Sequence, residues 1–178
     1  MLFHPVVIVL ALLVALPRVA PPAPSPAPPG ATPAVPVSPR IEKLKIAGEE
    51  FKLEVAADED ARAQGLMKRA KLDADKGMIF IYPEPEELSF WMKNCVIDID
   101  ILYLDAKGTI VATHKMKAEP PQRANEHELD YEARLERYPS RRPAQFGIEL
   151  KTGTIERLKL KPGQRIEMDV ERLGKLAK

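Results

Sequence analysis

The chain has 178 residues, which suits one domain of ordinary size with a terminal extension. Its 27 Lys and Arg residues nearly balance its 26 Asp and Glu residues, and Arg18 and Arg40 are the only charged side chains before Ile41. Residues 41–178 therefore have almost no net charge, and no overall electrostatic attraction draws them to nucleic acid or to anionic lipid. We predict no nucleic-acid partner. The single cysteine excludes an internal disulfide.

Residues 1–20 contain an unbroken apolar run from Val6 to Leu16. This run is short for a bilayer span but has the length of a signal-peptide core. We therefore predict export to the periplasm or the exterior of a bacterial cell. The run has no Lys or Arg before it and ends in a poor cleavage site, so an uncleaved anchor that tethers the protein to the inner membrane is the alternative.

Residues 21–40 hold half of the chain's 18 prolines among alanine, serine and valine. This composition predicts an extended, proline-rich linker that holds the folded part away from the N-terminus. We expect residues 41–178 to form a single β-rich domain.

The start of this domain alternates apolar and polar residues on either side of Ala47-Gly48-Glu49, which predicts a β-hairpin. Asp58 offers a helix N-cap, and residues 59–69 place acidic residues first and basic residues last, as a short helix prefers. A further strand is expected over residues 77–81, ended by Pro83 and Pro85.

The remaining strands are expected before and after a bend at Lys93-Asn94, and over residues 109–116, 144–150 and 165–170, with a helical turn near residues 154–158. Short strands at such close spacing predict a mainly β fold, a small β-barrel or sandwich of about eight short strands with one or two short helices.

A charged segment from Glu119 to Pro143 interrupts this pattern. Tyr131, Leu135 and Tyr138 fall at helical spacing, and Asp130 is placed to pair with Arg134. The segment is either a surface helix or a mobile loop.

The bend itself lies in the most informative stretch, Leu88 to Ile101, which contains the only Trp and the only Cys. Beyond the bend, the strand face that carries Asp98 and Asp100 continues into two leucines, so we expect Asp100 to be at least half buried. A buried carboxylate needs a partner, and Lys93 and Arg69 are the expected candidates.

The run Phe90-Trp91-Met92-Lys93-Asn94, with Ile97 and Asp100-Ile101, resembles the signature F-W-M-K-N-T-x-I-P-L-D-I of domain-of-unknown-function family 192. Residues 65–69, 77–80 and 144–153 add to the resemblance, which extends from about Ile41 to Met168. Cys95 stands where the family has Thr, and Asp98 stands where it has Pro. The resemblance implies a small β-rich domain, often exported, with no assigned activity.

Three possible chemistries have simpler structural explanations. His114, Glu119, His127 and Glu128 lack the spacing of zinc signatures, so no metal site or cofactor is expected. Cys95 has no nearby histidine to activate it and is expected to be a small buried hydrophobe. Trp91 could stack on a planar ligand, although a lone Trp more often belongs to the core.

Five polar residues lie in or beside apolar strands, where a polar side chain needs a hydrogen-bond or ionic partner: Arg69, Lys93, Asn94, Asp100 and Glu149. They form either a structural salt-bridge network or, together with Trp91, a cleft that binds a small polar ligand, a peptide end or an envelope protein. We expect a non-enzymatic binding or accessory module; the alternative is an envelope hydrolase that uses Asp100 and Glu149 as an acid/base pair. Carboxyl groups roughly 5 to 10 Å apart in an open cleft would favour the enzyme.

Overall fold

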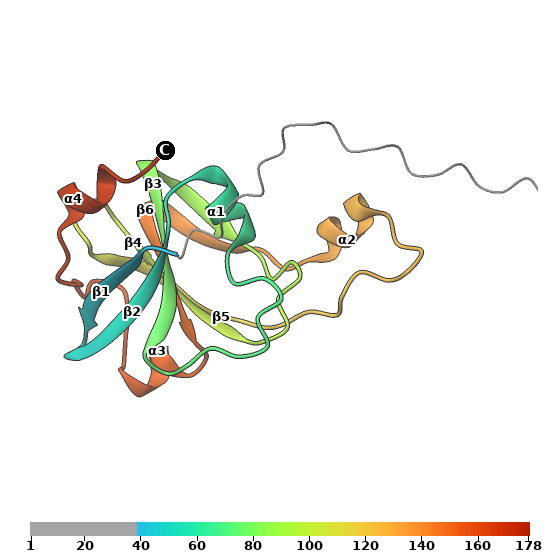
Figure 1. Ribbon diagram of the computed structural model, residues 1–178, viewed down its shortest axis with the longest axis horizontal. Helices are drawn as coiled ribbons and strands as arrows, with labels where there is room; N and C mark the ends of the chain where they lie inside the picture. The colour runs from blue at the N-terminus through green and yellow to red at the C-terminus, as the bar shows by residue number, and fades with distance from the viewer. Residues whose placement is uncertain (1–38) are drawn as a thin grey trace, which may run out of the picture. The chain divides into compact units, whose positions relative to one another are not determined.

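The computed structural model describes residues 39–178, so the predicted signal or anchor (1–20) and nearly all of the predicted linker (21–40) lie outside the described residues. Figure 1 shows the described part as one curved sheet with short helices at its edges. The strands follow the order β1-β2-β3-β6-β4-β5, and only β2 and β3 run parallel. Their bounds are β1 Ile41–Ile46, β2 Glu49–Ala56, β3 Lys76–Phe90, β4 Ile99–Leu104, β5 Ile110–Met116 and β6 Tyr138–Lys151.

The described residues include four short helices: α1 Glu59–Gln64, α2 Glu128–Arg134, α3 Thr154–Arg157 and α4 Val170–Gly174. The predicted N-cap at Asp58 is confirmed, because its Oδ1 accepts the Ala61 N–H at 2.9 Å. None of the helices in residues 39–178 is long and apolar enough to cross a membrane.

The predicted mainly β class is confirmed, but the sheet is not closed into a barrel and has six strands rather than about eight. One difference arises at Pro83 and Pro85, which were expected to end a strand. Instead β3 continues through them, because its register against β6 shifts between Ile81 and Glu86. A proline is tolerated in such a bulge, where no ladder N–H is required.

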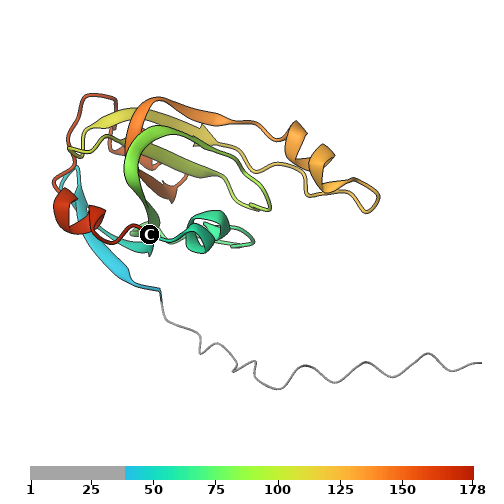
Figure 2. The same ribbon diagram turned by 90° about the horizontal axis from the view of Figure 1, so that it is seen from above.

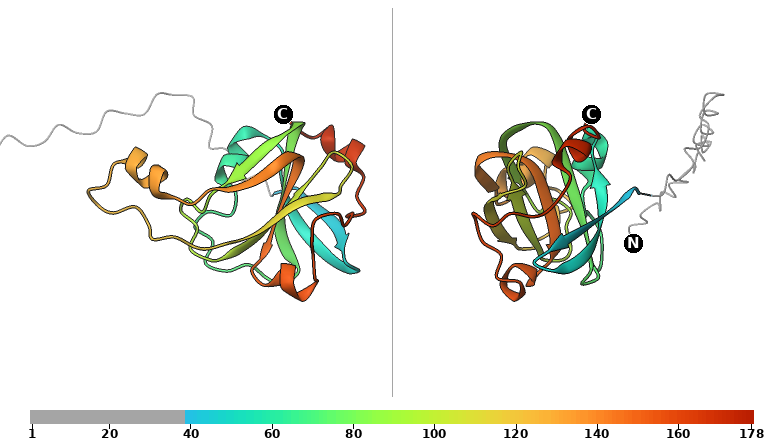
Figure 3. Two further views of the ribbon diagram at one scale, coloured as in Figure 1. Left: turned by 180° about the vertical axis from the view of Figure 1, so that it is seen from behind. Right: turned by 90° about the vertical axis from the view of Figure 1, so that its left-hand side faces the viewer.

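The second difference concerns residues 165–170, which were expected to form a strand. They make only isolated bridges, Lys45 with Glu167 and Thr109 with Arg165. Figure 3 shows this segment running past β1 on its way to α4. It spans the gap between the two edge strands without completing a ladder.

The sheet separates two hydrophobic clusters. Strand β4 is buried along its whole length, so its alternating side chains serve both clusters: Leu102 and Leu104 belong to one, and Ile101 and Tyr103 to the other. On the neighbouring strand β6, Leu150 pairs with Asp100 and Glu149 pairs with Ile101. Side chains of paired residues share a face, so Asp100 and Glu149 point to opposite faces of the sheet.

Candidate functional site

A pocket of about 540 Å³ lies between α1 and the curled part of β3, on the face of the sheet that carries Glu149. Figure 2 shows α1 opposite this part of β3. The wall combines charged and polar side chains with apolar ones, which include Leu66, Met67, Phe80, Tyr82, Phe90 and Trp91. Phe80 and Phe90 meet edge to face with ring centres 4.8 Å apart, which fixes both rings in the wall.

Glu149 is the one carboxyl group of the pocket lining that is buried, with 4% of its surface exposed. Its Oε2 has no hydrogen-bond partner among the described residues. Burial raises the pKa of Glu149 to about 8, and the positive charge of Arg69 partly opposes this rise. The pocket lining therefore includes a buried carboxyl group that is mostly protonated at pH 7 and has unused hydrogen-bonding capacity.

Arg69 does not reach Glu149 with a hydrogen bond. Its two terminal nitrogens donate to the two carboxylate oxygens of Glu54, each at 2.5 Å. Both terminal nitrogens of the Arg69 guanidinium are thus bound to Glu54. The positive charge of Arg69 acts on Glu149 only through space. The partner was missed in the sequence because it lies on β2, before the helix that precedes Arg69.

Asp100 is fully buried, as the alternation predicted, but its predicted partner was wrong. Neither Lys93 nor Arg69 binds it; its Oδ2 accepts the Ile155 N–H at 2.8 Å, in the first turn of α3. The reason is the strand alternation, which turns Asp100 away from both cations. Because Glu149 lies on the other face, the two carboxyl groups do not share a cleft, and the acid/base pair of the hydrolase alternative is not formed.

Lys93 lines the pocket, and its partners come from the charged segment. Its Nζ contacts Glu132 at 2.5 Å and also pairs with Glu128, and hydrogen bonds to Glu128 and Glu132 raise the pKa of Lys93. The two glutamates lie one turn apart on α2 and so face the same way. The charged segment, which the sequence did not connect with the stretch from Leu88 to Ile101, thus neutralises Lys93 of that stretch.

Trp91 is half-buried in the pocket wall and does not belong to the core, contrary to expectation. The guanidinium carbon of Arg137 lies 3.8 Å from its ring centre, and Lys93 Nζ lies 5.4 Å from it. These cation–π contacts hold the ring at the pocket edge. Arg137 itself is exposed and is not part of the pocket lining.

Asn94 does not line this pocket. Its backbone occupies the left-handed region with φ of +55°, and its N–H donates to Tyr131 Oη at 3.0 Å. Asparagine tolerates this conformation better than most residues, which explains the bend. The role of Asn94 seen here is to fix the turn between Lys93 and Cys95.

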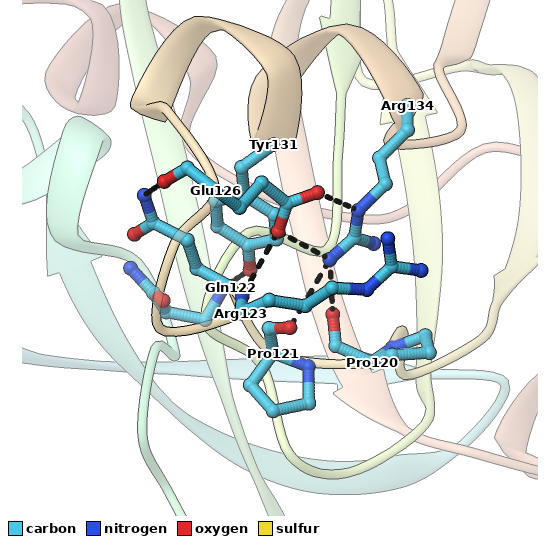
Figure 4. A network of polar contacts seen from close by, with 8 residues as sticks. Pro120, Pro121, Gln122, Arg123, Glu126, Tyr131 and Arg134 are labelled. Carbon is cyan, nitrogen blue, oxygen red and sulfur yellow. Dashed lines mark hydrogen bonds and ion pairs between the residues drawn. The ribbon is translucent and has the colours of Figure 1, made fainter.

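The charged segment is held by its own polar network, drawn in Figure 4. Arg134 donates to the Glu126 carboxylate at 2.7 Å and to the carbonyls of Pro120 and Pro121 at 3.1 Å. The expected pair with Asp130 is absent from the contacts of the described residues, because Arg134 turns toward the loop that precedes α2. Residues 128–134 are helical, which resolves the choice between helix and loop for this part of the segment.

Cys95 is buried, as predicted, and burial raises the pKa of its thiol to about 12. A thiolate is therefore scarce at neutral pH, so the residue acts as a small hydrophobe in the pocket wall. His114 Nε2 contacts the Pro139 carbonyl at 2.9 Å. Across residues 39–178, no three His, Cys, Asp or Glu side chains are grouped so that they could hold a metal ion.

The sequence of this domain matches the model of a known family. Residues 42–168 match the model of DUF192, a family described as an uncharacterised ACR. The chain belongs to DUF192. No curated protein matches the chain.

Two solved structures resemble this DUF192 domain. One is a protein from Sinorhizobium meliloti 1021, described as a candidate transcription regulator; it is 33% identical over 74% of this chain and 95% of its own, with a TM-score of 0.59. The other is a protein of unknown function from Novosphingobium aromaticivorans DSM 12444, 25% identical over 80% of this chain and 94% of its own, with a TM-score of 0.56. The pocket of this DUF192 domain includes Gly65, Phe80, Phe90, Trp91 and Glu149, all in segments that carried the family resemblance.

Proposed function

We propose that this DUF192 domain is a non-enzymatic binding module that takes a small polar ligand into the pocket ending at Glu149. The observation that carries the proposal is the unpartnered Glu149 Oε2 in the pocket lining. A buried polar atom without a hydrogen bond costs free energy, and a ligand that supplied the missing bond would recover it. Such groups are frequent at functional sites.

The arrangement offers little for a hydrolase. Asp100 and Glu149 lie on opposite faces of the sheet, and the Cys95 thiol has a raised pKa. A pocket of about 540 Å³ that combines aromatic and aliphatic side chains with polar groups has instead the size of a small-molecule site.

A ligand screen by thermal shift on the full chain tests this proposal. A ligand that binds the folded state raises the melting temperature by mass action. We expect Ala63→Trp, which places a large ring in the pocket lining, to abolish the shift. Ala70→Trp makes the same change at an exposed position outside the pocket and should preserve it. Equal shifts in both variants would place the ligand elsewhere and contradict the proposal.

We also propose that the folded domain acts outside the cytoplasm, in the periplasm or on the cell exterior. The apolar run Val6 to Leu16 followed by the proline-rich stretch supports this proposal. Cell fractionation with a C-terminal tag is the test. Shortened protein in the periplasm or medium indicates a cleaved signal, full-length protein in the membrane indicates an anchor, and full-length protein in the cytosol contradicts export.

A further inference from the structure

We propose that the ligand of this pocket carries an organic cation, an ammonium or guanidinium group on an apolar or aromatic body. The inference rests on the proposed binding function and deepens it by naming the chemical class of the ligand.

The cations of the pocket lining are already occupied. Arg62 donates to the carbonyl oxygens of Ala57 at 2.9 Å, Ile81 at 3.0 Å and Lys178 at 3.1 Å. Lys93 is held by two glutamates of α2. A guanidinium with three carbonyl partners and an ammonium with two carboxylates have little left to offer an anionic ligand.

The carboxyl groups of the lining are in the opposite situation. Glu59 on α1 and Glu86 on β3 are exposed at the rim, and within residues 39–178 neither side-chain carboxylate makes a hydrogen bond or an ion pair. Glu149 adds the unpartnered Oε2 in the interior. The nearby cation Arg69 is neutralised by Glu54. The unpaired charge of the pocket is therefore that of the two rim carboxylates, and it favours a positively charged ligand.

The apolar wall suits the rest of such a ligand. Phe80, Tyr82 and Phe90 present aromatic surface, and ring faces attract ammonium and guanidinium groups. The Arg62 guanidinium already stacks on Tyr82, with 5.1 Å from its carbon to the ring centre. A cation that reached Glu149 would lower the pKa of the carboxyl group, which would release its proton and accept a charge-assisted hydrogen bond from the ligand. The apolar body of the ligand would cover the aromatic side chains of the wall.

Three probes of nearly equal shape test the charge directly: benzylamine, benzyl alcohol and benzoate. Trp91, the only tryptophan of the chain, lines the pocket, so its fluorescence reports binding at this place. We expect benzylamine to bind the full chain at least about tenfold more tightly than benzyl alcohol, and benzoate to bind most weakly. Phenylalanine amide and its N-acetyl form extend the test to a peptide end: loss of binding on acetylation would show that a peptide amino terminus can supply the cation.

Glu149→Gln should weaken benzylamine binding by about tenfold and leave benzyl alcohol binding nearly unchanged, because glutamine keeps the shape but cannot release a proton and become an anion beside the bound cation. Glu84→Gln, at an exposed position of the same strand as Glu86 but outside the pocket, should change neither. The double change Glu59→Gln with Glu86→Gln, on the exposed rim, should weaken benzylamine binding by about two- to fivefold even if the interior variant folds poorly.

Two results would overturn the inference in different ways. If Trp91 fluorescence shows that benzyl alcohol or benzoate binds at least as tightly as benzylamine, the pocket binds ligands but an organic cation is the wrong class of ligand. If no probe binds and the thermal-shift screen finds no pocket ligand, the binding function fails as well.

Discussion

Glu149→Gln is expected to raise the free energy of unfolding by about 4 kcal/mol at pH 9 relative to wild type, and to change it little at pH 5. Burial raises the pKa of Glu149 from 4.5 to about 8 in the folded state. The folded state therefore holds the proton more tightly than the unfolded state does. The stability contributed by the neutral acid is fully present below pH 4.5, falls as the pH rises and is lost above about 8. Glutamine is neutral throughout and shows no such loss.

Urea denaturation of both proteins between pH 5 and 9 measures this difference. Contributions that are the same in both proteins cancel when the two curves are subtracted. The neighbouring Tyr82 and Cys95, whose pKa values burial raises to about 12, do not titrate in the range. Glu84→Gln serves as the exposed control and should follow wild type. Parallel curves for wild type and Glu149→Gln would show that the carboxyl group is ionised and solvated.

Asp100→Ala is expected to lower the free energy of unfolding by about 2 to 3 kcal/mol. Oδ2 of this fully buried residue accepts the Ile155 N–H at 2.8 Å, so the substitution leaves a buried donor without a partner at the start of α3. The cost comes from this stranded N–H and a small cavity, not from a stranded cation. Asp100→Asn keeps an acceptor oxygen and should cost about 1 kcal/mol or less.

Asp98→Ala provides the comparison, since Asp98 lies on the same strand face before β4 begins. Its carboxylate accepts from Lys117 Nζ at 2.6 Å and from the Ala118 N–H at 2.9 Å, both at the surface, where water can replace them. Equilibrium denaturation at one pH compares the three variants. If Asp98→Ala and Asp100→Ala cost the same, Asp100 does not stabilise the start of α3.

Local patterns predicted the burial of Asp100 and of Cys95, because strand alternation and residue size depend on near neighbours in the sequence. They did not predict the partner of Asp100. That partner depends on the register between β4 and β6, whose paired residues Asp100 and Leu150 lie 50 positions apart. The same register separates Asp100 from Glu149, which the sequence alone had left open.

The pocket could be predicted only in part. Arg69, Trp91, Lys93 and Glu149 were singled out as charged or aromatic residues in apolar surroundings, and all but Arg69 line the pocket. The partners of Lys93 were not foreseen, because Glu128 and Glu132 belong to a segment that resembles a surface excursion. Arg137 was missed for the same reason. Helical spacing of the two glutamates was the only available signal.

The proposed binding site depends on a buried carboxyl group in the pocket lining that is mostly protonated at physiological pH before a ligand binds. A pH titration of the Glu149 side-chain carboxyl carbon by ¹³C NMR tests this most directly, with the signal assigned by its loss in Glu149→Gln. The structure predicts a titration midpoint at about 8. A midpoint near the ordinary value of 4.5 would contradict the claim, because it would mean that the carboxylate is solvated or paired and offers the ligand no unpartnered acid.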